Sequence, residues 1–308
     1  DGSVSEALDP VIPHIIYHLQ DGKRIIVSGR RMPTSLLRSE YLAGQVALLP
    51  TDEQRMLVDY VHPEPGKTFL EVRAFGQGQV WVSGEPITRW EGYLPRALFF
   101  FFVDRAMTTR DEIFQTFWPN LSAREATNVF HVTKRKISEI LGVSLTVYGS
   151  GFYRISPDID LHYDVVNFQE AVQHAEISED EEAERLYKIA IDLYREEFLS
   201  SIPAEWAVRR REEMRTTYTE ALIGLARIYE NSGKLEQALG HYLRASAVSS
   251  GREDLTRSIM QMYVDLGQPY LALDTYKRLE AILKRRFGVS PDPQTKQLMQ
   301  NIKASLKK

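Results

Sequence analysis

A repeated pattern near the carboxyl end constrains the fold of this chain more than any other feature. Residues 225–245 and 260–280 each read as a helix, a glycine turn and a second helix, and key positions recur at an interval of 34 residues. The matching positions are Tyr229 with Tyr263, Gly233 with Gly267, Ala238 with Ala272, and Tyr242 with Tyr276. The small alanine lets the two helices approach, and the tyrosines fill the gap between them. Such units stack into a solenoid with a concave binding surface.

This pattern resembles that of tetratricopeptide repeats. The segment "EEAERLYKIAIDLY" repeats the second-helix motif out of register, with Ala183, Tyr187 and Ala190 at its key positions. We therefore assign residues 158–308 to one helical repeat domain and expect the chain to be helical from Asp158 onward.

The rest of the chain divides at "HPEPGK", where two prolines and a glycine break the pattern. Residues 1–66 read as a small α/β segment with short buried strands. Residues 67–157 begin with alternating aromatic and valine positions, which predict an antiparallel sheet. Helices follow at about 95–105, 110–117 and 123–141, and a hairpin closes the domain across Gly149 to Gly151. The fold class is thus mainly α with a small β component.

The helix at 123–141 has an unusual charge distribution. The whole chain has a net charge of −4, yet Lys134, Arg135 and Lys136 follow one another. At 100° per residue the apolar positions fall on one face; these are Ala126, Phe130, Thr133, Ile137, Ile140 and Leu141. Asn128, His131, Val132 and Arg135 fall on the opposite face, and the two lysines flank the apolar stripe.

This layout suits the major groove of DNA. Arginine pairs with guanine through two hydrogen bonds, asparagine pairs with adenine in the same way, and lysines neutralise phosphates. For an isolated helix, a solvated amphipathic surface is the ordinary alternative, so the neighbouring elements decide the interpretation.

A sheet, then three helices, then a hairpin is the order of elements in a winged helix-turn-helix. Residues 96–142 with "YGSGFYRI" resemble the response-regulator-type winged helix, and more closely the DNA-binding half of the SARP activators. "TTRDEIFQTFWP" is similar to the second helix of that family, and "GSGFY" to its wing, with Phe152 as a departure. The ending "YKRLEAILKRRFGVSPDPQT" resembles the bacterial transcriptional activator domain, although Arg286 and Phe287 replace the usual Glu-Leu.

The resemblance covers about residues 68–308 and implies roles for particular residues. Helix 123–141 would read bases and wing 148–153 would enter the minor groove. The DNA-binding residues that it implies are Thr109, Arg110, Asn128, His131, Lys134, Arg135, Lys136, Ser150 and Gly151.

Nothing in the sequence points to catalysis. Residues 1–66 resemble the end of the ATPase core in signal-transduction ATPases, but no G-x-x-x-x-G-K-[ST] phosphate-binding loop occurs in the chain. The seven histidines lack metal-ligand spacing, and there is no cysteine. We therefore expect no enzyme activity, no catalytic residue, no metal and no cofactor.

The sequence predicts a transcriptional regulator, an activator, that binds double-stranded promoter DNA in the cytoplasm, associated with the nucleoid. Its expected partners are RNA polymerase, a second copy of the chain, and a peptide or small-molecule effector at the repeats, with no membrane. Two alternatives stay open at this point. One is a tetratricopeptide scaffold that uses the winged helix for protein contacts, and the other is the carboxyl-terminal part of a larger signal-transduction ATPase regulator.

Overall fold

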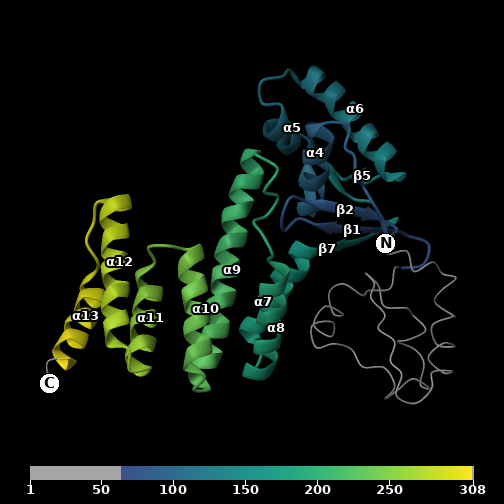
Figure 1. Ribbon diagram of the computed structural model, residues 1–308. Coiled ribbons are helices and arrows are strands. Elements are labelled where there is room, and N and C mark those ends of the chain that lie inside the picture. Colours follow the sequence, from purple (N-terminus) through teal and green to yellow (C-terminus); the bar gives the residue numbers. More distant parts are fainter. Residues whose placement is uncertain (1–63, 307–308) are drawn as a thin grey trace, which may run out of the picture. The chain divides into compact units, whose positions relative to one another are not determined.

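The computed structural model describes residues 64–306 (Figure 1). The α/β segment expected for residues 1–66 therefore lies outside the described residues, apart from its last three positions. The described chain forms two compact units. The first contains residues 64–74 and 78–164, and the second contains residues 75–77 and 165–306.

The first unit begins with a mixed sheet, which contains the expected antiparallel strands and one further strand that pairs in parallel. Its strands are β1 (Thr68–Arg73), β2 (Gln79–Val82), β3 (Glu85–Pro86) and β7 (Ile159–Tyr163), in the order β3-β2-β1-β7. Gly76 and Gly78 lie in the loop between β1 and β2 with φ angles of 112° and 88°, which favour glycine.

The expectation of helix from Asp158 onward is wrong for β7. This strand pairs in parallel with β1, and Leu70 lies opposite Leu161. The uninterrupted series of helices expected from Asp158 begins only at Asp164, with α7. Because β7 is part of the sheet, the first unit extends past residue 157.

Three helices follow the sheet: α4 (Tyr93–Asp104), α5 (Arg110–Phe117) and α6 (Ala123–Leu141). Capping boxes begin two of them, Thr109 with Glu112 for α5 and Ser122 with Glu125 for α6. Gly142, with φ of 69°, ends α6 in the left-handed conformation. These local signals explain why the ends of α5 and α6 fall where the sequence predicts them.

Helix α4 forms the centre of the first unit and packs on α6. Its four consecutive phenylalanines, Phe99 to Phe102, are each no more than 2% exposed. Consecutive helical residues point in different directions, so this helix is surrounded on most sides. Rings that contact the four phenylalanines belong to Trp90, Phe117, Phe130 and Tyr153.

A second sheet carries the expected hairpin. Its strands are β4 (Met107–Thr109), β6 (Phe152–Ile155) and β5 (Thr146–Gly149), in the order β4-β6-β5. The sequence predicted β5 and β6 but not β4, which has only three residues. We call β5, β6 and the turn between them the wing.

The second unit is helical, as the repeat pattern predicts (Figure 1). Its helices are α7 (Asp164–Ile177), α8 (Asp180–Leu193), α9 (Glu205–Asn231), α10 (Leu235–Val248), α11 (Glu253–Asp265), α12 (Pro269–Phe287) and α13 (Pro293–Ser305). From α8 to α13 each helix packs on the next. Ala238 and Ala272, matched in the repeat, are both fully buried. Gly233 and Gly267 turn the chain with φ angles of 75° and 72°.

Substitution of Gly224, inside α9, can test how closely α9 packs against α8. A methyl group at Gly224 would lie 2.4 Å from Cζ of Tyr187 on α8. Gly224→Ala is expected to lower stability by about 1 kcal/mol, because overpacking of about 1–3 kcal/mol outweighs a helix-propensity gain of about 1 kcal/mol. Gly240→Ala on α10 is the matched control, since nothing lies within 4 Å of its added methyl group. Thermal unfolding of both variants checks this, and equal stabilisation by both would contradict it.

Candidate nucleic-acid interface

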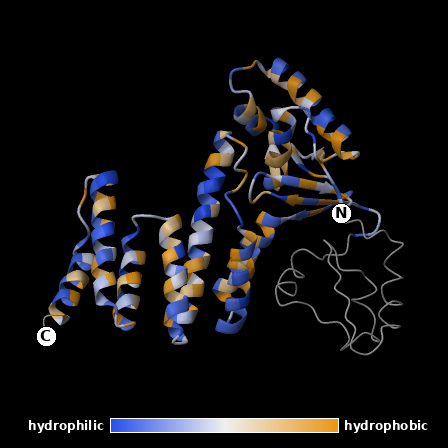
Figure 2. Ribbon diagram, viewed as in Figure 1, coloured by the Kyte–Doolittle hydropathy of each residue, from blue (hydrophilic) through white to orange (hydrophobic). Residues whose placement is uncertain are grey.

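Helix α6 separates an apolar face from a polar one, as its alternating colours in Figure 2 show. Ala126, Phe130, Thr133, Ile137 and Leu141 are buried, while Ile140 keeps partial exposure. Asn128, His131, Val132 and Arg135 are exposed on the opposite side. The face expected to meet a ligand is therefore open to solvent, and a ring contact joins His131 to Phe130 at 5.4 Å between ring centres. We call these four residues, with Glu139, the outer face of α6.

Arg135 is more exposed than the two lysines beside it. It is 81% exposed, and its Nε donates to Oε1 of Glu139 at 2.7 Å, one helical turn away. An exposed pair of this kind contributes little to stability, about 0.3–0.5 kcal/mol. The pair is therefore easily opened by a ligand that offers the guanidinium a better acceptor.

The two lysines beside Arg135 have different surroundings. The Lys134 ammonium lies 5.2 Å from the centre of the Tyr153 ring, and burial lowers its pKa. Lys136 lies on the other shoulder, where its Nζ is 3.5 Å from Oε2 of Glu91. Lys134 thus links the helix to the wing, whereas Lys136 pairs with Glu91 and remains 40% exposed.

Thr109 and Arg110 begin helix α5. The Thr109 hydroxyl accepts a hydrogen bond from the backbone N–H of Glu112, so it serves as the helix cap. Arg110 is exposed, and its guanidinium lies 5.9 Å from the Phe114 ring centre. Thr109 also pairs with Phe152 of β6, which brings the start of α5 beside the wing.

The wing turns at Ser150 and Gly151, with φ angles of 53° and 88°. Two consecutive positive φ values characterise the tight hairpin turn that fits twisted strands. Tyr153 anchors the wing, because its buried ring lies 5.2 Å from that of Phe130. Tyr148 and Phe152 remain exposed on the strands that carry the tip.

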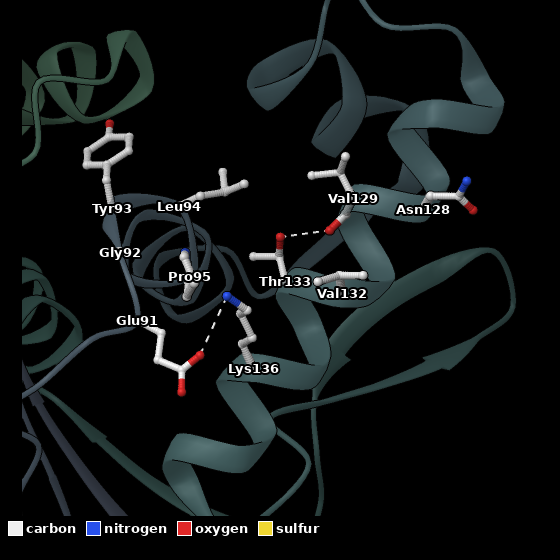
Figure 3. Close-up of a pocket in the computed structure, with 10 residues that line it drawn as sticks. All are labelled: Glu91, Gly92, Tyr93, Leu94, Pro95, Asn128, Val129, Val132, Thr133 and Lys136. Carbon is white, nitrogen blue, oxygen red and sulfur yellow. Dashed lines mark hydrogen bonds and ion pairs between the residues drawn. The ribbon is translucent and has the colours of Figure 1, made fainter.

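A pocket of about 450 Å³ lies beside α6, between that helix and the start of α4 (Figure 3). Its walls are formed by Glu91, Gly92, Tyr93, Leu94 and Pro95 on one side, and by Asn128, Val129, Val132, Thr133 and Lys136 on the other. The Lys136–Glu91 pair crosses one end of the pocket, and Asn128 lies toward the other. One row of α6 residues, spaced four apart, thus borders both the outer face and the pocket.

Sequence reasoning gave no role to three residues on or near this face. Arg124, in the first turn of α6, is exposed and forms no ion pair with any described residue. Glu139 holds Arg135, and Val132 had been placed on the face without a role. Extending the same helical wheel to the capped start of α6 would have found Arg124, because its angle is close to that of Arg135.

Two features, a metal-binding cluster and a membrane-spanning helix, are absent from the described range. Residues 64–306 hold no cluster of histidine, aspartate or glutamate side chains that could bind a metal ion. Within the same range, no helix combines the length and the apolar character needed to cross a bilayer.

Comparison with known proteins now adds to this geometry. The sequence model of the family described as "Bacterial transcriptional activator domain" matches residues 163–303, which is α7 to α13 with the end of β7. No curated protein matches the sequence.

Among solved structures, the chain is similar to "Mycobacterium tuberculosis EmbR in complex with low affinity phosphopeptide". The TM-score is 0.63 at 18% sequence identity, and the match covers 78% of this chain and 66% of that chain. The present chain thus spans just under two thirds of the EmbR chain, and the likeness concerns the fold.

A winged helix unit followed by a bacterial transcriptional activator domain is the arrangement of SARP-like regulators. The fold class expected from the sequence is confirmed, and so is the resemblance to this class. Residues 163–303 match the bacterial transcriptional activator domain, and the fold of the chain is similar to that of EmbR.

Proposed function

We propose that the chain is a sequence-specific, duplex DNA-binding transcriptional activator that inserts α6 into the major groove of promoter DNA. The observation that carries this proposal is the outer face of α6, where Asn128, His131 and Arg135 are exposed opposite a buried stripe. A helix with a free polar face and a fixed apolar face can approach base edges without unfolding any part of the core.

The residues of the interface have separate roles in this proposal. Arg135 and Asn128 hydrogen-bond to base edges, and His131 contacts a base or a phosphate. Lys136 and Arg110 contact phosphates, while Lys134 supports the wing through Tyr153. Thr109 positions α5 by capping it, and Ser150 and Gly151 carry the wing tip to the minor groove.

The partners of the second unit follow from its class and its repeats. We infer that it contacts RNA polymerase, supports a homodimer, or binds an effector along its helices. The EmbR structure contains a phosphopeptide, which favours a peptide as the effector. In this proposal the protein works in the cytoplasm, at the nucleoid, without enzyme activity or cofactor.

The affinity for DNA is expected to depend strongly on salt. If about four to six phosphates are neutralised, log affinity falls with log salt at a slope near −4 to −5. Lys136→Ala should weaken all duplexes to a similar extent and reduce this slope by about one unit. Titration of labelled duplexes at several salt concentrations measures both quantities.

Lys277→Ala is the matched control, because Lys277 is an exposed lysine whose Nζ lies 3.1 Å from Asp274 on α12. It should leave the slope unchanged. A slope near zero for the unaltered chain would overturn the proposal, and a slope unchanged by Lys136→Ala would remove that residue from the interface.

A second function, a repeat scaffold whose winged helix contacts proteins, is favoured by two ion pairs. A scaffold is expected to neutralise its own basic surface, and Arg135 and Lys136 do pair with Glu139 and Glu91. Both pairs are exposed, so DNA phosphates and bases compete for them at little cost. Selection of duplexes from random DNA by the purified chain separates the two functions, since a scaffold would enrich no common sequence.

A further inference from the structure

Val132 is an apolar side chain in the middle of a polar surface. It is 58% exposed on the outer face of α6, with Asn128 one turn before it and Lys136 one turn after it. It also borders the pocket beside α6 but leaves most of its own surface open to solvent (Figure 3). The core of the first unit does not use this side chain, since the buried face of α6 lies opposite to it.

The chemistry of valine restricts what it can recognise in DNA. It has no hydrogen-bonding group, so it gains nothing from phosphates or from the donors and acceptors of bases. In the major groove, thymine is the unmodified base that presents a methyl group, at C5. A β-branched side chain on a helix also keeps one preferred rotamer, so its two methyl groups stay in place.

The neighbours of Val132 set its position relative to the bases. Asn128 and Arg135 lie on one side of it on the helical wheel, about 40° and about 60° away, within the part of α6 proposed to hydrogen-bond to base edges. Lys136, beyond it, lies on the shoulder proposed to meet a phosphate. Val132 therefore lies between the hydrogen-bonding row and the DNA backbone, at the depth of the groove where a C5-methyl group projects.

We propose that Val132 is a specificity-determining residue that contacts the C5-methyl group of one thymine in the operator. This inference rests on the proposed function, because it requires α6 to lie in the major groove. Burying one methyl group against valine is expected to change affinity by about three- to fivefold.

The test begins with operators selected from random duplexes by the purified full chain. Each thymine of the selected site is then replaced in turn by deoxyuridine, which removes only the C5-methyl group. The unaltered chain should lose about three- to fivefold in affinity at one thymine and little at the others. Val132→Ala should bind the thymine operator more weakly by a similar factor, and should lose nothing further when that thymine becomes deoxyuridine.

Val208→Ala is the matched control, because Val208 is also an exposed helical valine, 43% exposed, on α9. It should keep the full sensitivity to deoxyuridine. Circular dichroism of Val132→Ala should match that of the unaltered chain, since no core contact is removed.

The possible results distinguish a failure of the proposed DNA-binding function from a failure of the role of Val132. Failure to enrich any duplex would remove the proposed function itself. Enrichment of an operator whose binding ignores every deoxyuridine substitution would overturn the role of Val132 alone. So would a Val132→Ala variant that keeps the same sensitivity as the unaltered chain.

Discussion

Replacing Phe130 by alanine is expected to destabilise the first unit by about 3–5 kcal/mol. The Phe130 side chain is fully buried and lies where α4, α5, α6 and the wing meet. Its ring centre lies 5.2 Å from that of Tyr153, 5.9 Å from that of Phe114 and 6.4 Å from that of Phe102. Alanine would leave a cavity that four elements border, so local collapse cannot fill it easily.

Chemical denaturation followed by tryptophan fluorescence measures this loss, and Trp118 is a suitable reporter because its ring centre lies 6.4 Å from that of Phe130. Because a chain with two compact units need not unfold in one step, the transition that Trp118 reports is fitted on its own. Phe287→Ala is the control, since the Phe287 side chain is 63% exposed on α12. A loss below about 1 kcal/mol for Phe130→Ala would mean that Phe130 does not hold the four elements together.

Local signals made the helices of the first unit predictable. Thr109 and Ser122 cap α5 and α6, and Gly142 stops α6 in the left-handed conformation. Each signal acts within one helical turn, so it is visible in the sequence alone. The repeats of the second unit were predictable for a related reason, because matched alanines and glycines mark the same local geometry twice.

Strand β7 could not be found in this way. Ile159 lies opposite Thr68, so the pairing that makes this segment a strand joins residues about ninety positions apart. The strand also contains Asp160 and His162, and its last residue leads directly into helix α7 at Asp164. No turn signal separates the strand from the helix, so in the sequence the strand reads as part of the helical region.

The candidate site was also only partly predictable from the sequence. The outer face of α6 follows from helical periodicity, so the exposure of Asn128, His131 and Arg135 agrees with the wheel. The partners of the lysines do not follow from it. Glu91 reaches Lys136 from the loop before α4, and Tyr153 reaches Lys134 from the wing. Contacts between segments that are distant in the sequence can be identified only from the folded structure.

Arg135→Ala is expected to weaken operator binding by about 1–3 kcal/mol and to relax the preference at one base pair. The guanidinium is 81% exposed, so its removal costs the fold almost nothing. The loss has two sources, however, because the variant leaves the Glu139 carboxylate unpaired on a surface that must approach DNA. A negative charge there weakens every duplex, whereas a missing base contact weakens the operator alone.

A double-mutant cycle separates these two sources. Glu139→Gln alone should strengthen binding to all duplexes, and Arg135→Ala with Glu139→Gln should retain the loss of base preference without the general loss. Arg209→Ala is the matched control, since Arg209 is an exposed arginine paired with Glu205 one turn away on α9, at 3.6 Å. Binding to the selected operator and to a scrambled one is measured for each variant at several salt concentrations. If Arg135→Ala weakens both duplexes equally even with Glu139→Gln present, or weakens neither, then Arg135 contacts no base and α6 does not read DNA through this residue.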